Sequence, residues 1–342
     1  MSTQGDMTFK SVPIVNREGT APDLKDLAGF YDKRFTGQYC KTHDGRHMRQ
    51  LATMLKCVPA TVSPSKVLDY GCGAGGCMTL LKDFFPDAEI HGIDISDEAL
   101  KKANSRFSDC RFASFDGSKA PYPDGNFDVI FSSHVLEHVL DLGKCIEDIA
   151  RMVRKGGYVC LTLPCANERS LEWKLTTLMK GGIIKSATGE EKWFWEDPSH
   201  LRRLTSSHLI NAFSKQGLQL KEAIFGNQFW GGIEGVCNCG PGIILDWLHV
   251  LDGKGLRAKT MLFFAKATLL LISPVFLASV NLRQKAHCSR GIRKFLYLAA
   301  MPVKLVYWPL AKWLRSLADE EWEIERKKTS GASQFLVFQK AQ

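Results

Sequence analysis

The sequence lacks several features that mark particular classes of protein. It contains no internal repeat and no low-complexity tract, which excludes solenoid and fibrous folds. Residues 1–22 are polar and include no apolar stretch, so we expect no signal peptide. The 11 cysteines are scattered and odd in number, which argues against a disulfide scaffold and favours a reducing compartment. With 45% hydrophobic and 24% charged residues, the composition is that of a globular protein.

Acidic residues are missing from one long segment. Residues 253–315 contain 12 lysines and arginines and no aspartate or glutamate, whereas the rest of the chain carries 33 basic and 36 acidic residues. The net charge of +9 therefore originates in this segment, which is also the most apolar part of the chain. Basic residues mixed with apolar ones fit an anionic membrane surface better than a nucleic acid. We therefore expect a membrane surface, and no nucleic acid, as a partner.

Apolar segments of strand length alternate with segments of helical pattern through much of the chain. This order predicts an α/β fold, with a parallel sheet covered by helices on both faces. We expect strands at residues 66–70, 89–95, 110–115, 127–132, 158–163, 218–224 and 334–338, helices at 45–58, 78–85, 97–107, 140–154 and 206–215, and a turn at 155–157.

The first expected strand leads into a glycine-rich turn and then into a helix. Glycines at this place let the backbone approach a ligand closely, with the helix N-terminus behind it. The spacing Gly71-x-Gly73-x-x-Gly76 satisfies the dinucleotide-binding fingerprint. Asp94, at the end of the second strand, is placed to bind ribose hydroxyls. A NAD-dependent enzyme is therefore one hypothesis.

Three features favour a different cofactor. Asp69 stands two residues before the first glycine, where a carboxylate suits a cationic ligand, such as an amino acid or a sulfonium, better than a diphosphate. Phe115 and Asp116 follow the third strand and suit an adenine ring and its exocyclic amine. The run from Tyr122 to His138 has no counterpart in a dehydrogenase.

These motifs together resemble those of class I S-adenosylmethionine-dependent methyltransferases, especially the branch that includes ubiquinone-biosynthesis and sugar O-methyltransferases. The resemblance is close from residue 67 to residue 164 and implies a seven-stranded, Rossmann-like, doubly wound sheet whose last strand is antiparallel. The matching motifs are Asp69-x-Gly71-x-Gly73-x-Gly75, Asp94, Phe115-Asp116, and Phe127-Asp-Val-Ile with Glu137-His138.

The resemblance also implies roles for these residues, with S-adenosyl-L-methionine as the cofactor. Asp69 and the backbone of Gly71, Gly73 and Gly75 would hold the methionyl part of the cofactor. Asp94 would bind both ribose hydroxyls.

The remaining implied contacts are to the adenine. Ile95 and Phe115 would lie against the ring, and its amine would donate to Asp116. Because the sulfonium is already activated, the protein would mainly position the reactants and remove a proton.

His134, Glu137 and His138 are candidates for the chemistry. If this segment is helical, the three side chains share one face, and either histidine could act as a general base. Some ubiquinone-type O-methyltransferases hold a divalent metal with Glu-x-x-Glu-His at this place. This chain departs from that pattern, because His134 replaces the first glutamate, and we predict no metal.

A third candidate histidine lies further along the chain. His200 belongs to the run of residues 197–203, and the resemblance places a histidine of this loop near the acceptor; the alternative is a hydrogen bond at a helix entry. Residues 193–195, Trp-Phe-Trp, are predicted to form a lid or a wall of the acceptor site. Tyr31 and Tyr39 precede the core, where related enzymes often close over the cofactor.

The basic segment contains two long apolar stretches. Residues 261–282 have the length of a membrane span, but two prolines and two lysines make residues 295–314 a poor partner for a second crossing. In a helix over residues 290–315, all six basic residues share one face, which predicts an interfacial helix. The alternatives are a substrate lid or a dimer surface.

These observations divide the chain into an N-terminal helical cap (1–65), a cofactor-binding core (66–224), a basic, apolar, helical insert that faces the membrane (225–332) and a last core strand (333–342). The predicted function is O-methylation of a lipid-linked sugar or another membrane-associated acceptor, by a cytoplasmic enzyme peripheral on the inner face of the membrane. The alternatives are a soluble small-molecule methyltransferase with a helical lid, and a non-catalytic scaffold.

Overall fold

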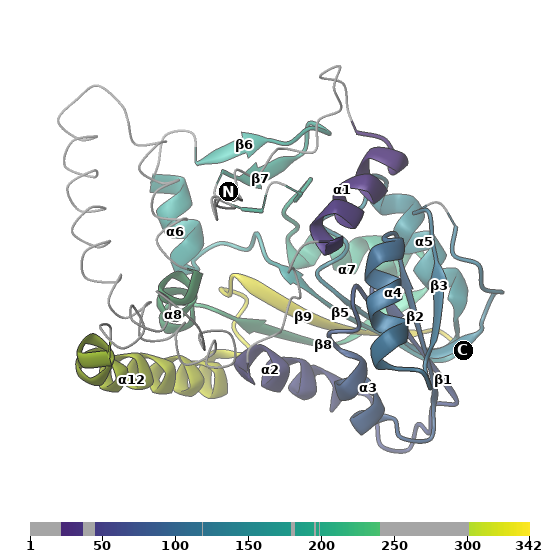
Figure 1. The fold of residues 1–342 in the computed structure, drawn as a ribbon, viewed down its shortest axis with the longest axis horizontal. Helices are drawn as coiled ribbons and strands as arrows, with labels where there is room; N and C mark the ends of the chain where they lie inside the picture. The colour runs from purple at the N-terminus through teal and green to yellow at the C-terminus, as the bar shows by residue number, and fades with distance from the viewer. Residues whose placement is uncertain are drawn as a thin grey trace, which may run out of the picture.

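A mixed seven-stranded sheet forms the centre of the computed structural model (Figure 1), which describes residues 22–36, 45–117, 119–178, 182–194, 196–197, 199–239 and 301–342. Its strand order is β3-β2-β1-β4-β5-β9-β8. The first five strands in this order pair in parallel, and β9 is antiparallel to both β5 and β8, which confirms the predicted fold class. The strands are β1 (Lys66–Tyr70), β2 (Glu89–Asp94), β3 (Arg111–Ser114), β4 (Phe127–Ser133), β5 (Val153–Pro164), β8 (Leu218–Gly226) and β9 (Ser333–Lys340).

Helices cover both faces of the sheet because its central strands are apolar on both sides. In β9, Phe335 and Val337 pack into one core cluster, whereas Leu336 and Phe338 pack into the other, as the two-residue period of a strand requires. The first cluster includes residues of α2 (Gly45–Leu55), α3 (Met78–Phe84) and α4 (Asp97–Arg106), and the second includes residues of α5 (Leu142–Met152) and α7 (Ser206–Lys215).

Side-chain caps fix where three of these helices begin. Ser96, Asp141 and Thr205 each accept a hydrogen bond from a backbone N–H in the first turn of α4, α5 and α7. Such a cap stabilises a helix by about 1 kcal/mol. The cap at Ser96 matters for the site, because it starts α4 directly after the end of β2.

The structure differs from the sequence-based expectation in the middle of the chain. The turn expected at residues 155–157 is instead part of β5, which begins at Val153 and pairs with Phe127 before its register shifts. The strand tolerates this irregularity because Gly156 adopts a φ of +72°. The helix α6 (Leu171–Leu178) and the small hairpin of β6 (Ile183–Lys185) and β7 (Glu191–Trp193) were not foreseen.

The predicted insert lies between two adjacent strands, β8 and β9. Its described ends are the helices α8 (Trp230–Cys239) and α12 (Met301–Glu325). The helix α12 overlaps the predicted interfacial helix and continues through Pro309 to Glu325. Its C-terminal half packs on the core, where the ring of Trp322 lies 5.4 Å from that of Phe335.

Much of the basic segment lies outside the described residues, including the apolar stretch 261–282. Among the helices that the structure does describe, none combines the length and the apolar character that crossing a membrane requires.

The two N-terminal helices occupy different places in the fold. The helix α2 is part of the core on one sheet face, whereas α1 (Leu24–Thr36) lies beside α4 (Figure 1). Asp32 of α1 accepts hydrogen bonds from the Ser96 hydroxyl at 2.7 Å and from the Glu98 N–H at 3.1 Å. These bonds hold α1 against the start of α4, next to the carboxyl ends of the parallel strands.

Candidate functional site

A cavity of about 350 Å³ lies where the parallel strands end. The last residues of four neighbouring strands line it, namely Tyr70, Asp94, Ser133 and Pro164. In doubly wound sheets, ligands bind at this edge, outside the carboxyl ends of the strands. The topology therefore places the cavity at the expected ligand site.

The helix α1 forms the opposite wall of the cavity. Five of its residues face the cavity at helical spacings of three and four: Leu24, Leu27, Tyr31, Arg34 and Phe35. Tyr31 therefore lies where the sequence predicted, whereas Tyr39 falls outside the described residues.

The glycine turn makes the floor of the cavity. Gly71 has a φ of +80°, and a Cβ atom at this position would lie 2.2 Å from Cγ2 of Val135, so no other residue fits without displacing the backbone. The N–H groups of Gly71 and Cys72 both donate to the carbonyl of Ile93, at 2.8 and 2.9 Å. The end of β2 thus fixes the shape of the turn.

Two carboxyl groups lie at this end of the cavity. Asp94 accepts hydrogen bonds from the N–H of Gly73 at 2.8 Å and of Ser96 at 2.9 Å. Burial nevertheless raises the pKa of Asp94 to about 6. Asp69 is buried behind the turn, and burial together with the nearby Asp94 raises its pKa to about 8.

The structure brings together only some of the residues predicted to bind the cofactor. Gly71, Gly73, Asp94, Ile95 and Phe115 all line the cavity. Asp69, Gly75 and Asp116 do not line it: Asp69 is buried in β1, Gly75 lies against Phe107, and Asp116 is exposed.

The segment that carries the first two candidate histidines is a turn and not a helix. His134 adopts a left-handed φ of +58°, and the N–H of His138 donates to the carbonyl of Val135 at 2.8 Å. The condition of a helix is therefore not met, and the three side chains do not share a helical face. The turn still brings the side chains of His134 and Glu137 together, because Nδ1 of His134 lies 3.0 Å from Oε1 of Glu137.

His138 meets His200 on the wall of the cavity, with ring centroids 4.7 Å apart. Nδ1 of His138 lies 3.0 Å from the carbonyl oxygen of Ser199, so this nitrogen donates the hydrogen bond. Burial lowers the pKa of His138 to about 3, although the Glu137 carboxylate opposes the shift. His138 is therefore neutral, with Nε2 as an acceptor.

His200 has a buried carboxylate behind it. Its Nδ1 lies 3.2 Å from Oε2 of Glu196. Burial alone would raise the pKa of Glu196, but the Arg203 guanidinium and His200 outweigh burial and lower it. The ionised Glu196 therefore accepts a hydrogen bond from Nδ1–H of His200. Nε2 of His200 is left available as an acceptor.

Arg203 contacts several side chains next to His200. It forms ion pairs with Glu196 and Glu172, and its guanidinium lies 3.4 Å from the centre of the Trp193 ring. Trp193 is thereby buried in β7 and does not line the cavity, so its predicted place in the acceptor wall is wrong. Trp195 lies outside the described residues.

An ion pair connects α1 to the loop that carries His200. Arg34 donates to both carboxylate oxygens of Asp197, at 2.6 and 3.3 Å. Burial would raise the pKa of Asp197, but Arg34 and the Ser199 hydroxyl bring it well below its usual range. No sequence pattern indicates this pair, because its two members are 163 positions apart.

The cavity therefore has two chemically distinct ends. One end combines the glycine turn with an aspartate, and the other combines His134, His138 and His200. Such an arrangement can place a nucleoside-containing cofactor next to an acceptor whose proton must be removed.

Comparison with known proteins gives a consistent result. A family model described as a methyltransferase domain matches residues 43–223, just over half of the chain. An uncharacterised methyltransferase of Schizosaccharomyces pombe is 29% identical over 143 residues, which are 38% of this chain and 50% of the relative. A demethylmenaquinone methyltransferase of Thermotoga maritima is 33% identical over 167 residues, which are 46% of this chain and 72% of the relative.

The coverage of the relatives is partial. The chain spans about half the length, or less, of the first curated relatives it matches. Among solved structures, the [4+2]-cyclase SpnF superposes with a TM-score of 0.51 at 15% identity, covering 94% of this chain and 98% of the cyclase. That likeness shows the fold alone, since one fold hosts several reactions.

Proposed function

The chain belongs to the class I S-adenosylmethionine-dependent methyltransferases, and from this premise we propose that it O-methylates a lipid-linked sugar or another membrane-associated acceptor. The observation that carries the proposal is the single cavity that joins the glycine turn and Asp94 to the histidine wall. The family match decides against the dinucleotide-binding alternative.

The residues of the cavity fit the cofactor of the family. Gly71 and Gly73 both line the cavity and carry no side chain, so the turn presents its backbone to a ligand. Asp94 reaches the cavity with an enclosed carboxylate, which suits a pair of hydroxyl donors. Ile95 and Phe115 add an apolar surface for a flat ring.

The bound cofactor supplies an activated methyl group, and the chain supplies position and proton removal. The carboxylate of Asp94 orients the ribose, and α1 excludes water from above the turn. His138 and His200 face the acceptor end with their Nδ1 atoms already engaged. Their Nε2 atoms are thus the groups that can accept the proton of an acceptor hydroxyl.

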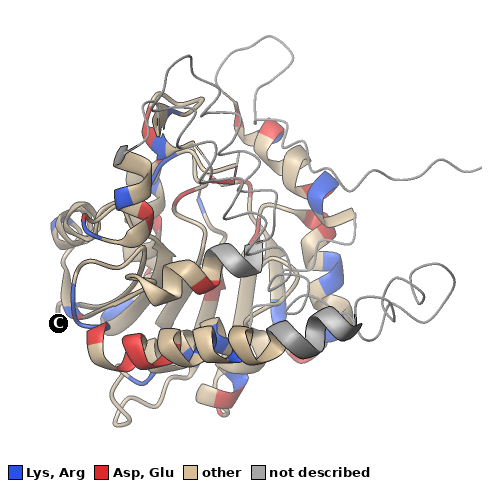
Figure 2. Ribbon diagram, turned by 90° about the vertical axis from the view of Figure 1, so that its left-hand side faces the viewer, with Lys and Arg blue, Asp and Glu red and all other residues tan. Residues whose placement is uncertain are grey.

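The surface of α12 supports a membrane-associated acceptor. Trp308 and Trp313 are 47% and 53% exposed, and Nζ of Lys312 lies 5.5 Å from the centre of the Trp308 ring. Tryptophan next to lysine is typical of the depth of lipid headgroups. The acidic residues of this helix all belong to its C-terminal half, which is marked in red in Figure 2, so its charge changes sign along its length.

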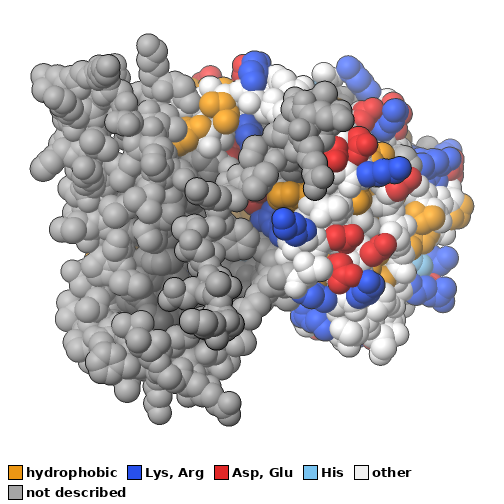
Figure 3. All heavy atoms as spheres, turned by 45° about the horizontal axis from the view of Figure 1, so that its top comes forward, with side chains coloured by type: hydrophobic (Ala, Val, Ile, Leu, Met, Phe, Trp, Pro, Cys, Tyr) orange, Lys and Arg blue, Asp and Glu red, His pale blue; other side chains and the backbone are white. Residues whose placement is uncertain are grey.

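The charged residues on the surface of the core argue against a nucleic-acid partner. On the face in Figure 3, the described side chains mix lysine and arginine with aspartate and glutamate over the core. A mixed surface of this kind offers no continuous basic track for a nucleic acid. We therefore propose that the enzyme meets its acceptor at the inner membrane surface and that it has no nucleic-acid partner.

Flotation with vesicles tests this proposal. The full chain should float with vesicles that contain anionic lipid. With methyl-labelled cofactor and a membrane lipid extract in the vesicles, the label should enter the organic phase. Trp308→Ser and Trp313→Ser should each weaken vesicle binding about tenfold, since burying a large apolar side chain contributes about 1.5–3 kcal/mol and these rings would be partly buried.

The matched control is Ile324→Ser on the acidic half of the same helix. Ile324 is 68% exposed, and its loss should leave vesicle binding unchanged. If the wild-type protein stays in the aqueous fraction and labels only water-soluble acceptors, the membrane proposal is wrong and the small-molecule alternative holds. The quinone in the name of the Thermotoga maritima relative makes a quinone-type phenol the second acceptor to try.

Cofactor affinity should depend on pH through Asp94. The carboxyl group, with a pKa of about 6, must be ionised to accept from two hydroxyls, so protonation competes with binding. We expect the affinity for S-adenosyl-L-methionine to fall about tenfold between pH 7 and pH 5. Calorimetric titration across this range measures the effect. Asp94→Asn should bind weakly with a flat profile; the same slope in this variant would assign the titration to another group.

A further inference from the structure

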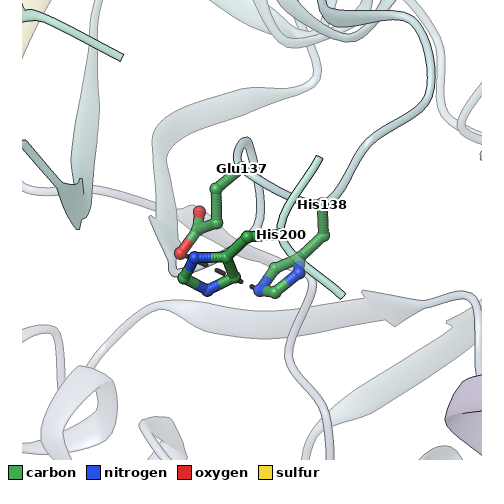
Figure 4. A group of neighbouring side chains, drawn as sticks. All are labelled: Glu137, His138 and His200. Carbon is green, nitrogen blue, oxygen red and sulfur yellow. Dashed lines mark ion pairs between the residues drawn. The ribbon is translucent and has the colours of Figure 1, made fainter. Parts of the chain in front are cut away.

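Three potential metal ligands converge beside the acceptor end of the cavity. The carboxylate of Glu137 and one ring nitrogen each of His138 and His200 all lie within 4.8 Å of one another, with the three side chains turned toward a common point (Figure 4). We propose that these three residues bind one divalent cation of the zinc class. This inference rests on the proposed function and changes one part of it. With the cation bound, the two Nε2 atoms would be ligands, and the cation would hold the acceptor oxygen and lower the pKa of its hydroxyl in place of a histidine base.

Glu137 is a buried carboxylate whose hydrogen bonding is incomplete. Its side chain is 1% exposed. Oε1 lies 3.0 Å from Nδ1 of His134, whereas the buried Oε2 has no hydrogen-bond partner among the described residues. A buried carboxylate oxygen without a donor is costly, and a cation at this point would satisfy it.

Both histidines are oriented as metal ligands usually are. Nδ1 of His138 donates to the Ser199 carbonyl, and Nδ1 of His200 donates to the Glu196 carboxylate. A second hydrogen bond of this kind fixes the tautomer of a metal-bound imidazole and leaves the lone pair of Nε2 for the metal. Nε2 of His138 already lies 3.9 Å from Oε1 of Glu137.

The ligand set differs from the one that the local sequence suggested. The prediction of no metal considered His134, Glu137 and His138 alone, with His134 in the place of a glutamate. In the folded chain, Nδ1 of His134 is engaged with Glu137, and His200 comes from a separate segment to complete the cluster. His134 is thus a positioning residue for Glu137.

The donor atoms indicate which cation the site prefers. Two imidazole nitrogens and one carboxylate oxygen match Zn²⁺, and also Mn²⁺, Fe²⁺ or Co²⁺, whereas Mg²⁺ prefers oxygen ligands. Three protein ligands leave one position open, which is typical of catalytic zinc sites. Because His138 and His200 line the cavity, an acceptor oxygen is the natural fourth ligand, and the acceptor is then a hydroxyl compound.

Metal titration of the full chain tests this inference. After chelator treatment and dialysis, we expect calorimetry to show one Zn²⁺ site per chain and no Mg²⁺ binding at the same concentrations. Co²⁺ should give the visible absorption of a four-coordinate site. Glu137→Gln and His200→Gln should abolish both signals, and Glu196→Gln, which alters only the outer hydrogen bond, should weaken Zn²⁺ binding about 10–100-fold.

The control is His208→Gln, which removes an exposed histidine of α7 and should leave Zn²⁺ binding unchanged. Titration with S-adenosyl-L-methionine is the separate readout for the proposed function, and His200→Gln should retain this binding. Wild-type protein that binds the cofactor but no Zn²⁺ would overturn the metal site alone. Zn²⁺ binding that survives in both His200→Gln and Glu137→Gln would also overturn it.

Discussion

Replacing Asp94 with alanine is expected to weaken the binding of S-adenosyl-L-methionine by about 100-fold or more. The substitution removes the acceptor for two hydroxyl donors, and a hydrogen bond to a charged group contributes about 1.5–3 kcal/mol. It also removes the partner of the N–H groups of Gly73 and Ser96, so the turn loses its anchor. Calorimetric titration at pH 8, where Asp94 is ionised in the wild-type protein, measures the loss.

The control for this substitution is Asp97→Ala. Asp97 is an exposed carboxylate at the start of α4, three residues from Asp94, and its removal should leave the affinity within about twofold. Unchanged affinity in Asp94→Ala would contradict the proposed cofactor site. Equal losses in both variants would instead point to a general effect of negative charge at this edge of the sheet.

Arg203→Leu should reduce the free energy of unfolding by about 3–5 kcal/mol, because breaking a buried ion pair leaves its partner charged and unpaired. The side chain is 3% exposed and pairs with Glu196 and Glu172. It also donates to the carbonyls of Cys165 and Ala332, at 2.9 and 3.0 Å. Denaturant unfolding of the purified protein measures the change.

Arg111→Leu provides the comparison for an arginine on the surface. Arg111 is 72% exposed and pairs with Glu89, so its loss should cost no more than about 1 kcal/mol. A loss in Arg203→Leu as small as this one would show that the buried network does not stabilise the fold. Because Arg203 also sustains the ionised Glu196, the variant should lower Zn²⁺ affinity as well.

The cofactor end of the cavity could be predicted because its residues are local in sequence. Gly71 and Gly73 belong to one turn, and Asp94 ends the strand that pairs beside it, so the pattern of strand, turn and helix already fixes their relative places. The parallel part of the sheet could be predicted for the same reason, since helical patterns separate most of its apolar runs.

The three histidines of the acceptor end were named from the sequence and all line the cavity. Their contacts could not be predicted, because this end is assembled from distant segments. His138 contacts the carbonyl of Ser199, which is 61 positions further along the chain, and Arg34 pairs with Asp197, which is 163 positions further along. No periodicity encodes such pairings. The left-handed turn at His134 also escaped prediction, because its i, i+3, i+4 spacing is equally typical of a helix.

The position of β9 has a consequence for how the protein is made. This strand, Ser333–Lys340, lies between β5 and β8, although all other strands of the sheet precede it in the chain. During synthesis, β8 therefore has no neighbour in the sheet until the residues of β9 have left the ribosome, more than 100 residues later. The edge of β5 stays unpaired for even longer, so the nascent chain exposes the kind of strand edge at which other chains can pair and aggregate.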